Sequence, residues 1–149
     1  MMSARRALAA AAVAVLAGCA SVQMAGPERD FAAKEFARPS KGKAALYVFR
    51  NGSNGGAAKM SLELDGAPLG ETAPKTFHWL TIKPGKHTLV GKGENESVIE
   101  FTAASGQNVF VWQDVPKMGL LSAGNRLELV DEQAGRAGVA ECEMAETPY

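Results

Sequence analysis

The sequence is poor in the residues that build metal centres, and it has no excess of charge of either sign. Its 149 residues include 2 cysteines and 2 histidines, and 16 Lys and Arg side chains balance 16 Asp and Glu side chains. Zinc needs three or four ligands at characteristic spacings, and neither HxxxH nor CxxC occurs, so we do not expect His78, His87 and Cys142 to hold a metal. Nucleic-acid binding is set aside, because neutralising phosphates requires clustered Lys and Arg.

A hydrophobic run long enough to cross a bilayer is also missing from the start of the chain. The apolar stretch there covers residues 7–17, about half of the ~20 residues that a transmembrane helix needs. Arg5 and Arg6 precede it and small residues follow it, an order typical of a secretory signal. We therefore predict that residues 1–18 are a signal peptide.

The end of this segment determines how the chain is released. Leu16, Ala17, Gly18 and Cys19 resemble the bacterial lipobox. The resemblance implies cleavage between Gly18 and Cys19 and a diacylglycerol thioether on Cys19, which a thiolate can form because it is a strong nucleophile near neutral pH. By resemblance to diderm lipoproteins, Ala20 in place of Asp implies sorting to the outer membrane, facing the periplasm. The alternative is ordinary cleavage after Ala20, which would discard Cys19 and leave a soluble protein.

Residues 19–43 are predicted to be a lipidated N-terminus and a flexible tether. Gly26-Pro27 and residues 39–42 are turn or linker signals, and the segment between them is too short to be a stable helix alone. A coil of this length has an end-to-end distance on the order of 25–30 Å, which would hold a domain clear of the lipid headgroups. The alternative is that Phe31 and Phe36 dock on the domain.

The rest of the chain, residues 44–149, is predicted to be one β-rich domain. Short strands separated by Gly and Pro turns indicate a mainly β fold, a small antiparallel β-sandwich or barrel-like domain. Asp65-Gly66 is a typical hairpin turn. Asp131 can cap a short C-terminal helix, which Gly135 and Gly138 weaken. The strands are expected over residues 44–50, 59–65, 69–72, 77–82, 87–90, 97–102, 109–112 and 127–130.

Five segments follow one another through most of this domain: GKAALYVFRN, LDGAPLGE, TFHWLTIKPGKHTL, NVFVWQ, and LELVDEQAG before Cys142. In this order the chain resembles the bacterial lipoprotein family called domain of unknown function 2846. The likeness extends from about Gly42 to Glu143. It implies a compact β-rich domain behind a lipobox, and it implies no activity.

Residues that would carry catalysis are not arranged in any familiar pattern. Gly-x-Ser-x-Gly is absent, Glu94 and Glu96 fall in a Gly-rich hairpin, and residues 52–56 lack the Lys-Ser/Thr of a phosphate loop. We therefore expect no enzyme, no catalytic residue and no bound cofactor. A hydrolase stays open as an alternative only if His78 or His87 lies in a cleft beside Ser or Asp.

Two features point to binding rather than to chemistry. Residues 117–124 join two strands yet carry Met118, Leu120 and Leu121, either as a loop folded over an open end of the domain or as an exposed apolar patch that meets another envelope protein or the membrane. Aromatic rings are the second feature, because Tyr47, Trp79 and Trp112 could stack on a glycan if exposed on one face. The segment PGKHTL also resembles a turn of carbohydrate-associated β-modules.

Cys142 has no partner within the chain if Cys19 is lipidated. It is expected to be buried as a small apolar residue, with an intermolecular disulfide as the alternative. Together these patterns predict a non-enzymatic, lipid-anchored envelope protein that serves as a structural or protein-interaction module. The expected partners are the membrane, through the lipid on Cys19, and an envelope protein. The alternative is a glycan- or peptidoglycan-binding module, and no small-molecule ligand is identified.

Overall fold

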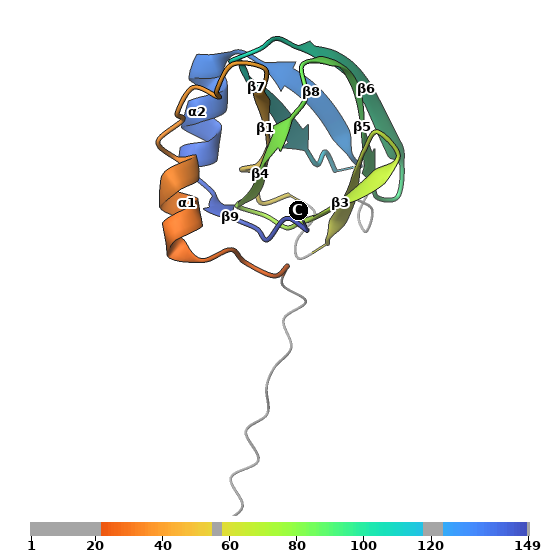
Figure 1. Ribbon diagram of the computed structural model, residues 1–149. Coiled ribbons are helices and arrows are strands. Elements are labelled where there is room, and N and C mark those ends of the chain that lie inside the picture. Colours follow the sequence, from red (N-terminus) through yellow and green to blue (C-terminus); the bar gives the residue numbers. More distant parts are fainter. Residues whose placement is uncertain (1–21, 55–57, 118–123, 149) are drawn as a thin grey trace, which may run out of the picture.

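The fold is a β-sandwich whose two sheets enclose one core and whose outer face carries two short helices (Figure 1). A computed structural model describes residues 22–54, 58–117 and 124–148. Within these residues no helix is long and apolar enough to span a bilayer. The elements are α1 (Pro27–Ala33), β1 (Ala44–Arg50), β2 (Met60–Leu64), β3 (Ala67–Thr72), β4 (Thr76–Ile82), β5 (Gly85–Lys92), β6 (Glu96–Ala103), β7 (Asn108–Asp114), β8 (Arg126–Val130), α2 (Glu132–Ala140) and β9 (Glu143–Met144).

The predicted mainly β class and all eight predicted strands are confirmed. One sheet has the order β8-β7-β1-β4-β9 and the other has the order β3-β2-β5-β6. The predicted pairing needs a correction, because β1 runs parallel to β7 and β4 runs parallel to β9, while the other pairs are antiparallel. The turn at Asp65 and Gly66 is confirmed, since both residues have positive φ (52° and 81°), as a two-residue type I′ hairpin requires.

The inner faces of the two sheets form an apolar core. All seven residues of β1 are buried, because the strand is central and both of its faces are covered. Leu46 and Val48 point inward, where they meet side chains of the second sheet such as Leu62 and Leu89. Tyr47 and Phe49 point to the opposite face. Strand alternation thus divides one apolar run between two separate clusters.

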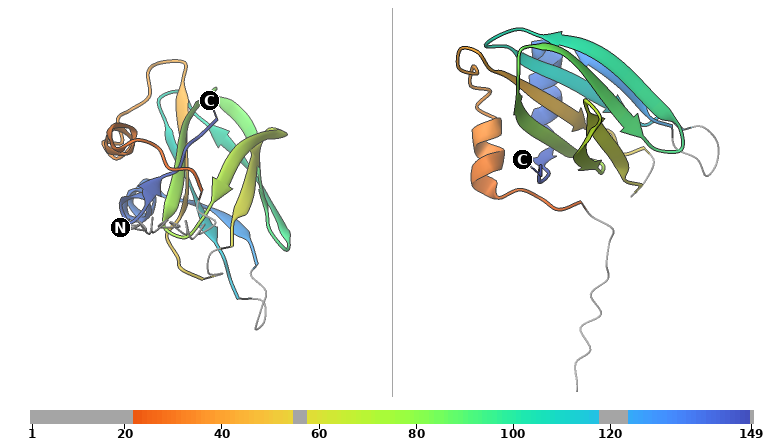
Figure 2. Two further views of the ribbon diagram at one scale, coloured as in Figure 1. Left: turned by 90° about the horizontal axis from the view of Figure 1, so that it is seen from below. Right: turned by 45° about the vertical axis from the view of Figure 1, so that its right-hand side comes forward.

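The helices cover the outer face of the five-stranded sheet, where they lie beside each other (Figure 2). The predicted cap of α2 is confirmed, since Asp131 Oδ1 accepts a hydrogen bond of 2.8 Å from the Ala134 amide. Gly135 and Gly138, which are predicted to weaken the helix, allow it to approach the sheet closely. A Cβ atom at Gly138 would overlap the ring of Phe49, and one at Gly135 would overlap Phe110.

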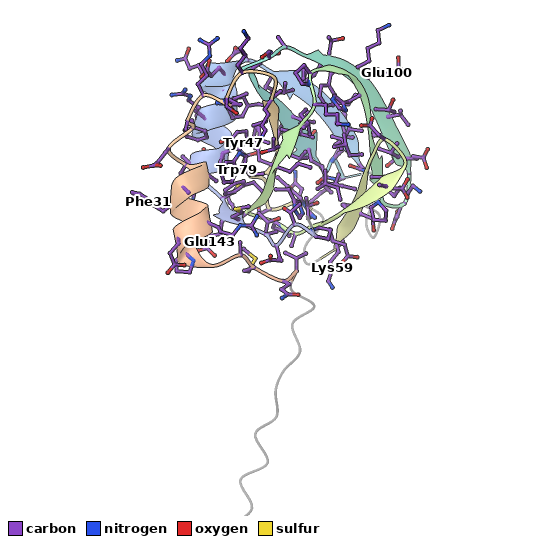
Figure 3. The ribbon with its side chains drawn as sticks, viewed as in Figure 1. Phe31, Tyr47, Lys59, Trp79, Glu100 and Glu143 are labelled. Carbon is purple, nitrogen blue, oxygen red and sulfur yellow. The ribbon has the colours of Figure 1, made fainter. Side chains whose placement is uncertain are left out.

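Residues 22–43 differ from the predicted tether, because they pack on the domain. Met24 forms a bridge with Ala145, and Asp30 Oδ1 accepts a hydrogen bond of 2.8 Å from the Met144 amide. Phe36 docks as the alternative proposed, with its ring centroid 5.5 Å from that of Tyr47. Phe31 does not dock: it is 71% exposed and points away from the sheets (Figure 3). Burial of Phe36 on an aromatic surface offsets the entropy of ordering a short segment.

The sandwich has two ends, which we call upper and lower as they appear in Figure 1. The upper end, where β1 begins, is formed by residues 36–43, 83–84 and 104–107 and the start of α2. The lower end, where β1 finishes, is formed by residues 22–25, 51–54, 73–75 and 93–95 and the segment from 141. Val22 lines the same hollow as Pro74 and Lys75 of the lower end.

Candidate functional site

The residues predicted from the lipobox and from the apolar loop lie outside the described part of the chain. These are Gly18 and Cys19 at the predicted cleavage site, and Met118, Leu120 and Leu121 in the loop. The loop begins and ends at the lower end, where the Gly124 amide donates a hydrogen bond of 2.8 Å to the Pro116 carbonyl.

His78 is fully buried on the inner face of β4. Its Nε2 lies 2.8 Å from the Glu71 carbonyl, and its Nδ1 lies 3.2 Å from Thr147 Oγ1. Because a carbonyl can only accept, Nε2 carries the proton and Nδ1 accepts from the threonine hydroxyl, which makes the ring neutral. Burial lowers the pKa of His78, and this outweighs the opposing effect of the Glu71 carbonyl. Both ring nitrogens of His78 therefore take part in hydrogen bonds within the fold.

The pKa of His87 is shifted in the opposite direction. Its Nδ1 lies 2.6 Å from Asp65 Oδ2 and its Nε2 lies 2.6 Å from the Lys83 carbonyl, so both ring nitrogens face acceptors. Burial lowers the pKa of His87, but the hydrogen bonds to Asp65 and Lys83 and the Asp65 charge together raise it above the ordinary value. Although the ring lies beside an aspartate, it has no free nitrogen with which to take a proton from a nucleophile.

The two histidines should give stability opposite dependences on pH. The unfolded chain protonates near pH 6.5, so the lowered pKa of His78 costs stability as the pH falls below that value. The raised pKa of His87 gives stability that is present below pH 6.5 and is lost as the pH rises through the folded-state pKa.

We therefore expect that lowering the pH from about 7.5 to about 5.5 reduces the free energy of unfolding of His78→Gln less than that of the parent. The same change in pH should reduce that of His87→Gln more. Urea unfolding at both pH values measures this difference. If both variants lost more stability than the parent, or both lost less, the opposite pKa shifts of the two histidines would be contradicted.

Cys142 is buried, as predicted, with 2% exposure, and it carries a free thiol. Its Sγ donates to the Gly138 carbonyl at 3.3 Å, and burial raises the pKa of the thiol to about 12. A protonated, buried thiol is a poor nucleophile. His78 faces the core while Cys142 belongs to the outer cluster, so the two are on opposite faces of the sheet. In the described residues no group of three or more His, Cys, Asp or Glu could hold a metal.

The three aromatic residues proposed as a stacking platform share the outer face of the five-stranded sheet, but they do not form an open surface. Tyr47 is fully buried beneath Phe36, and burial raises the pKa of its hydroxyl to about 12, with Arg136 opposing. Trp79 and Trp112 are half-buried against the same cluster. The glycan hypothesis required all three rings to be exposed, and Tyr47 does not meet that condition (Figure 3).

A buried cation at the lower end was not predicted from the sequence. Arg50 is 1% exposed, and its guanidinium donates to the carbonyls of Ala58 (2.6 Å), Asn54 (3.0 Å) and Thr72 (3.5 Å). No carboxylate pairs with it among the described residues, and its Nε has no hydrogen-bond partner. Burial lowers its pKa.

Polar side chains continue from Arg50 across the lower end of the core. Thr72 hydrogen-bonds Gln113, whose Nε2 donates to Asn125 Oδ1 at 3.0 Å. Asn95 Nδ2 in turn donates to the Asn125 carbonyl at 2.9 Å. Asn125 Nδ2 has no hydrogen-bond partner among the described residues, while the other hydrogen bonds of the cluster link the loops of the lower end.

A groove of about 640 Å³ lies at the upper end. Its walls include Phe101 from β6, Leu129 from β8, and Arg38 from the segment before β1. Leu129 is 46% exposed, and Arg38 lies across Gly106. Asp131, Glu132 and Arg136 also border it, so apolar groups and charges of both signs line one concave surface, a combination that can bind a ligand. Sequence reasoning missed it because its residues come from segments far apart in the chain.

Comparison with known proteins places the chain beside proteins that have no assigned activity. A family model described as "Protein of unknown function (DUF2846)" matches residues 40–124. An uncharacterized protein of Haemophilus influenzae is 36% identical over 132 residues, covering 88% of this chain and 78% of the relative. No solved structure matches the chain.

Proposed function

The chain belongs to the DUF2846 family of proteins of unknown function, and we propose that this member is a lipid-anchored protein of the bacterial envelope. Its β-domain serves as a non-catalytic interaction or structural module. The residue after the lipidated cysteine is Ala20, which favours the outer membrane, with the domain facing the periplasm.

The observation that carries the proposal is the place of Leu16, Ala17, Gly18 and Cys19 directly before the fold. They follow a short apolar run, and the first described residue of the domain, Val22, is three positions after Cys19. Cleavage before Cys19 would therefore leave the domain, which the structure describes from Val22 on, intact. An acyl chain contributes about 0.8 kcal/mol per buried methylene, so two or three chains anchor a protein stably.

The docked segment also sets the distance of the domain from the bilayer. Val22 is 7% exposed and lies at the lower end, and three residues span at most about 11 Å at ~3.6 Å each. With an anchor on Cys19, the lower end lies against the headgroups. The distance between domain and headgroups is then at most about 11 Å, rather than the roughly 25–30 Å expected for a free tether.

Replacing Cys19 tests the anchor. We expect Cys19→Ala to move the protein from the membrane fraction to the soluble fraction, because no acyl chain can then attach. Cys142→Ala is the matched control and should leave the protein in the membrane fraction. Fractionation followed by immunoblotting measures both. An unchanged distribution of Cys19→Ala, or a mature chain that starts unmodified at Ser21 in mass spectrometry, would contradict the proposal.

A further inference from the structure

The upper groove lies where the edges of the two sheets separate. β6 and β8 are the last strands of their sheets. Toward the lower end they are held together, because the Leu127 amide donates to Ser97 Oγ at 3.0 Å and the Asn125 amide donates to Asn95 Oδ1 at 2.7 Å. Toward the upper end Phe101 and Leu129 line the opening instead. Edge strands present backbone donors and acceptors, so this opening suits an extended chain.

Cations without partners surround the upper end. None of them forms an ion pair or a side-chain hydrogen bond within the residues that the structure describes. They are Arg38, Lys41, Lys43, Lys83 and Lys86, all exposed. At the lower end Lys59, Lys75 and Lys92 each pair with a glutamate, while Lys117 forms no ion pair among the described residues. The unpaired charge at the upper end favours an anionic partner.

The acidic groups of the groove are already occupied. Asp131 accepts the hydrogen bond that caps α2, and Glu132 pairs with Arg136 at 2.5 Å. Asn108 Nδ2 donates to the Phe36 carbonyl at 3.1 Å, while its buried Oδ1 has no donor among the described residues. A ligand can therefore bring carboxylates to the cations, an N–H donor to Asn108 and apolar side chains to Leu129.

From these features we infer that the upper groove binds an extended peptide of alternating acidic and apolar side chains, presented by another envelope protein. The inference rests on the proposed function as an interaction module, and it names the site and the chemistry of the partner. Strand addition at β6 or β8 supplies backbone hydrogen bonds, the apolar side chains pack on Phe101 and Leu129, and the carboxylates face Arg38 and its neighbouring lysines. The groove opens at the end away from the proposed anchor.

The test uses the mature, lipidated protein in detergent micelles and a fluorescent octapeptide of alternating Glu and Leu. We expect saturable binding by fluorescence anisotropy that weakens as salt is added. Leu129→Asp and Arg38→Glu should each weaken it about tenfold or more. Val98→Asp and Arg126→Glu are matched controls, since Val98 is 53% exposed on β6 and Arg126 is exposed on β8, both outside the groove. They should change the affinity by less than about twofold.

Several results would overturn the inference. One is binding of the Glu-Leu peptide that the groove variants do not alter. Others are equal binding of an octapeptide of Lys and Leu, and no binding of the acidic peptide at millimolar concentration. Binding of a soluble peptidoglycan fragment to the groove in place of the peptide would assign a glycan occupant. Circular dichroism of each variant confirms that loss of binding is not loss of fold.

The outcome is separable from that of the anchoring experiment. Peptide binding is measured on the domain and does not depend on Cys19, so Cys19→Ala should bind the peptide with unchanged affinity. A protein that stays in the membrane fraction and binds no peptide would reject the groove and leave the anchor intact. A protein that binds the peptide but is not lipidated would reject the anchor and leave the groove intact as a binding site.

Discussion

Gly138→Val should lower the free energy of unfolding by about 3 kcal/mol, the upper part of the range for overpacking a core. Val and Gly differ by only a few tenths of a kcal/mol in helix propensity, so the loss reports on packing rather than on the helix itself. The added Cβ would overlap Cε2, Cζ and Cδ2 of Phe49. Phe49 is 3% exposed in the outer cluster, so its ring has no free space to move into and α2 must shift away from the sheet.

The neighbouring position on the same helix provides the control for this substitution. Ala137 is exposed, so Ala137→Val adds the same side chain to solvent and should cost about 0.6 kcal/mol from propensity alone. Urea denaturation of both variants, with equal slopes, measures the difference. Equal losses at the two positions would contradict the close approach of α2 to β1.

Local signals in the sequence were enough to predict the strands. Met60, Leu62 and Leu64 alternate with polar residues, and Asp65-Gly66 closes a hairpin within the same segment, so both pattern and turn are set by neighbours in the chain. The cap at Asp131 is local in the same way. Each of these interactions joins residues a few positions apart.

Pairing between distant segments was not predictable in that way. β1 lies parallel to β7, with Ala45 opposite Asn108, and the apolar run of residues 44–49 gives no sign of which strand will pair with each of its edges. Docking of residues 22–43 depends on Phe36 meeting Tyr47 and Phe110, which the segment itself does not reveal. The tether was predicted from turn signals and from the shortness of the segment between them, whereas burial against distant residues determines its conformation.

The binding features escaped prediction for the same reason. The cations of the upper end come from residues 38–43 and 83–86, and only the meeting of β1 with the end of β4 brings them together. Arg50 is the last residue of an otherwise apolar strand. In the structure it is buried because carbonyls of residues 54 and 58 turn back onto it. Charge in a sequence marks exposure only when no loop can supply acceptors.

Arg50→Met should lower the free energy of unfolding by about 3 kcal/mol, because buried acceptors lose their donor. Methionine keeps an unbranched stem of similar length but cannot donate to the carbonyls of Asn54 and Ala58. Arg50→Lys keeps the charge and should cost less, although one ammonium cannot reproduce the planar fork that reaches both carbonyls. Urea denaturation gives the size of each loss.

The matched control, Arg126→Met, removes an arginine whose ion pair with Asp114 is exposed, so its cost should stay below about 1 kcal/mol. Two opposing contributions determine the effect at Arg50: the cost of burying its charge and the hydrogen bonds that it donates. Burial lowers the pKa of this guanidinium, so the charge itself is costly to place there, and an apolar replacement recovers that cost. The carbonyls of residues 54 and 58 lose their donor at the same time. A variant as stable as the parent would mean that the first term cancels the second, and that Arg50 does not stabilise the lower-end loops.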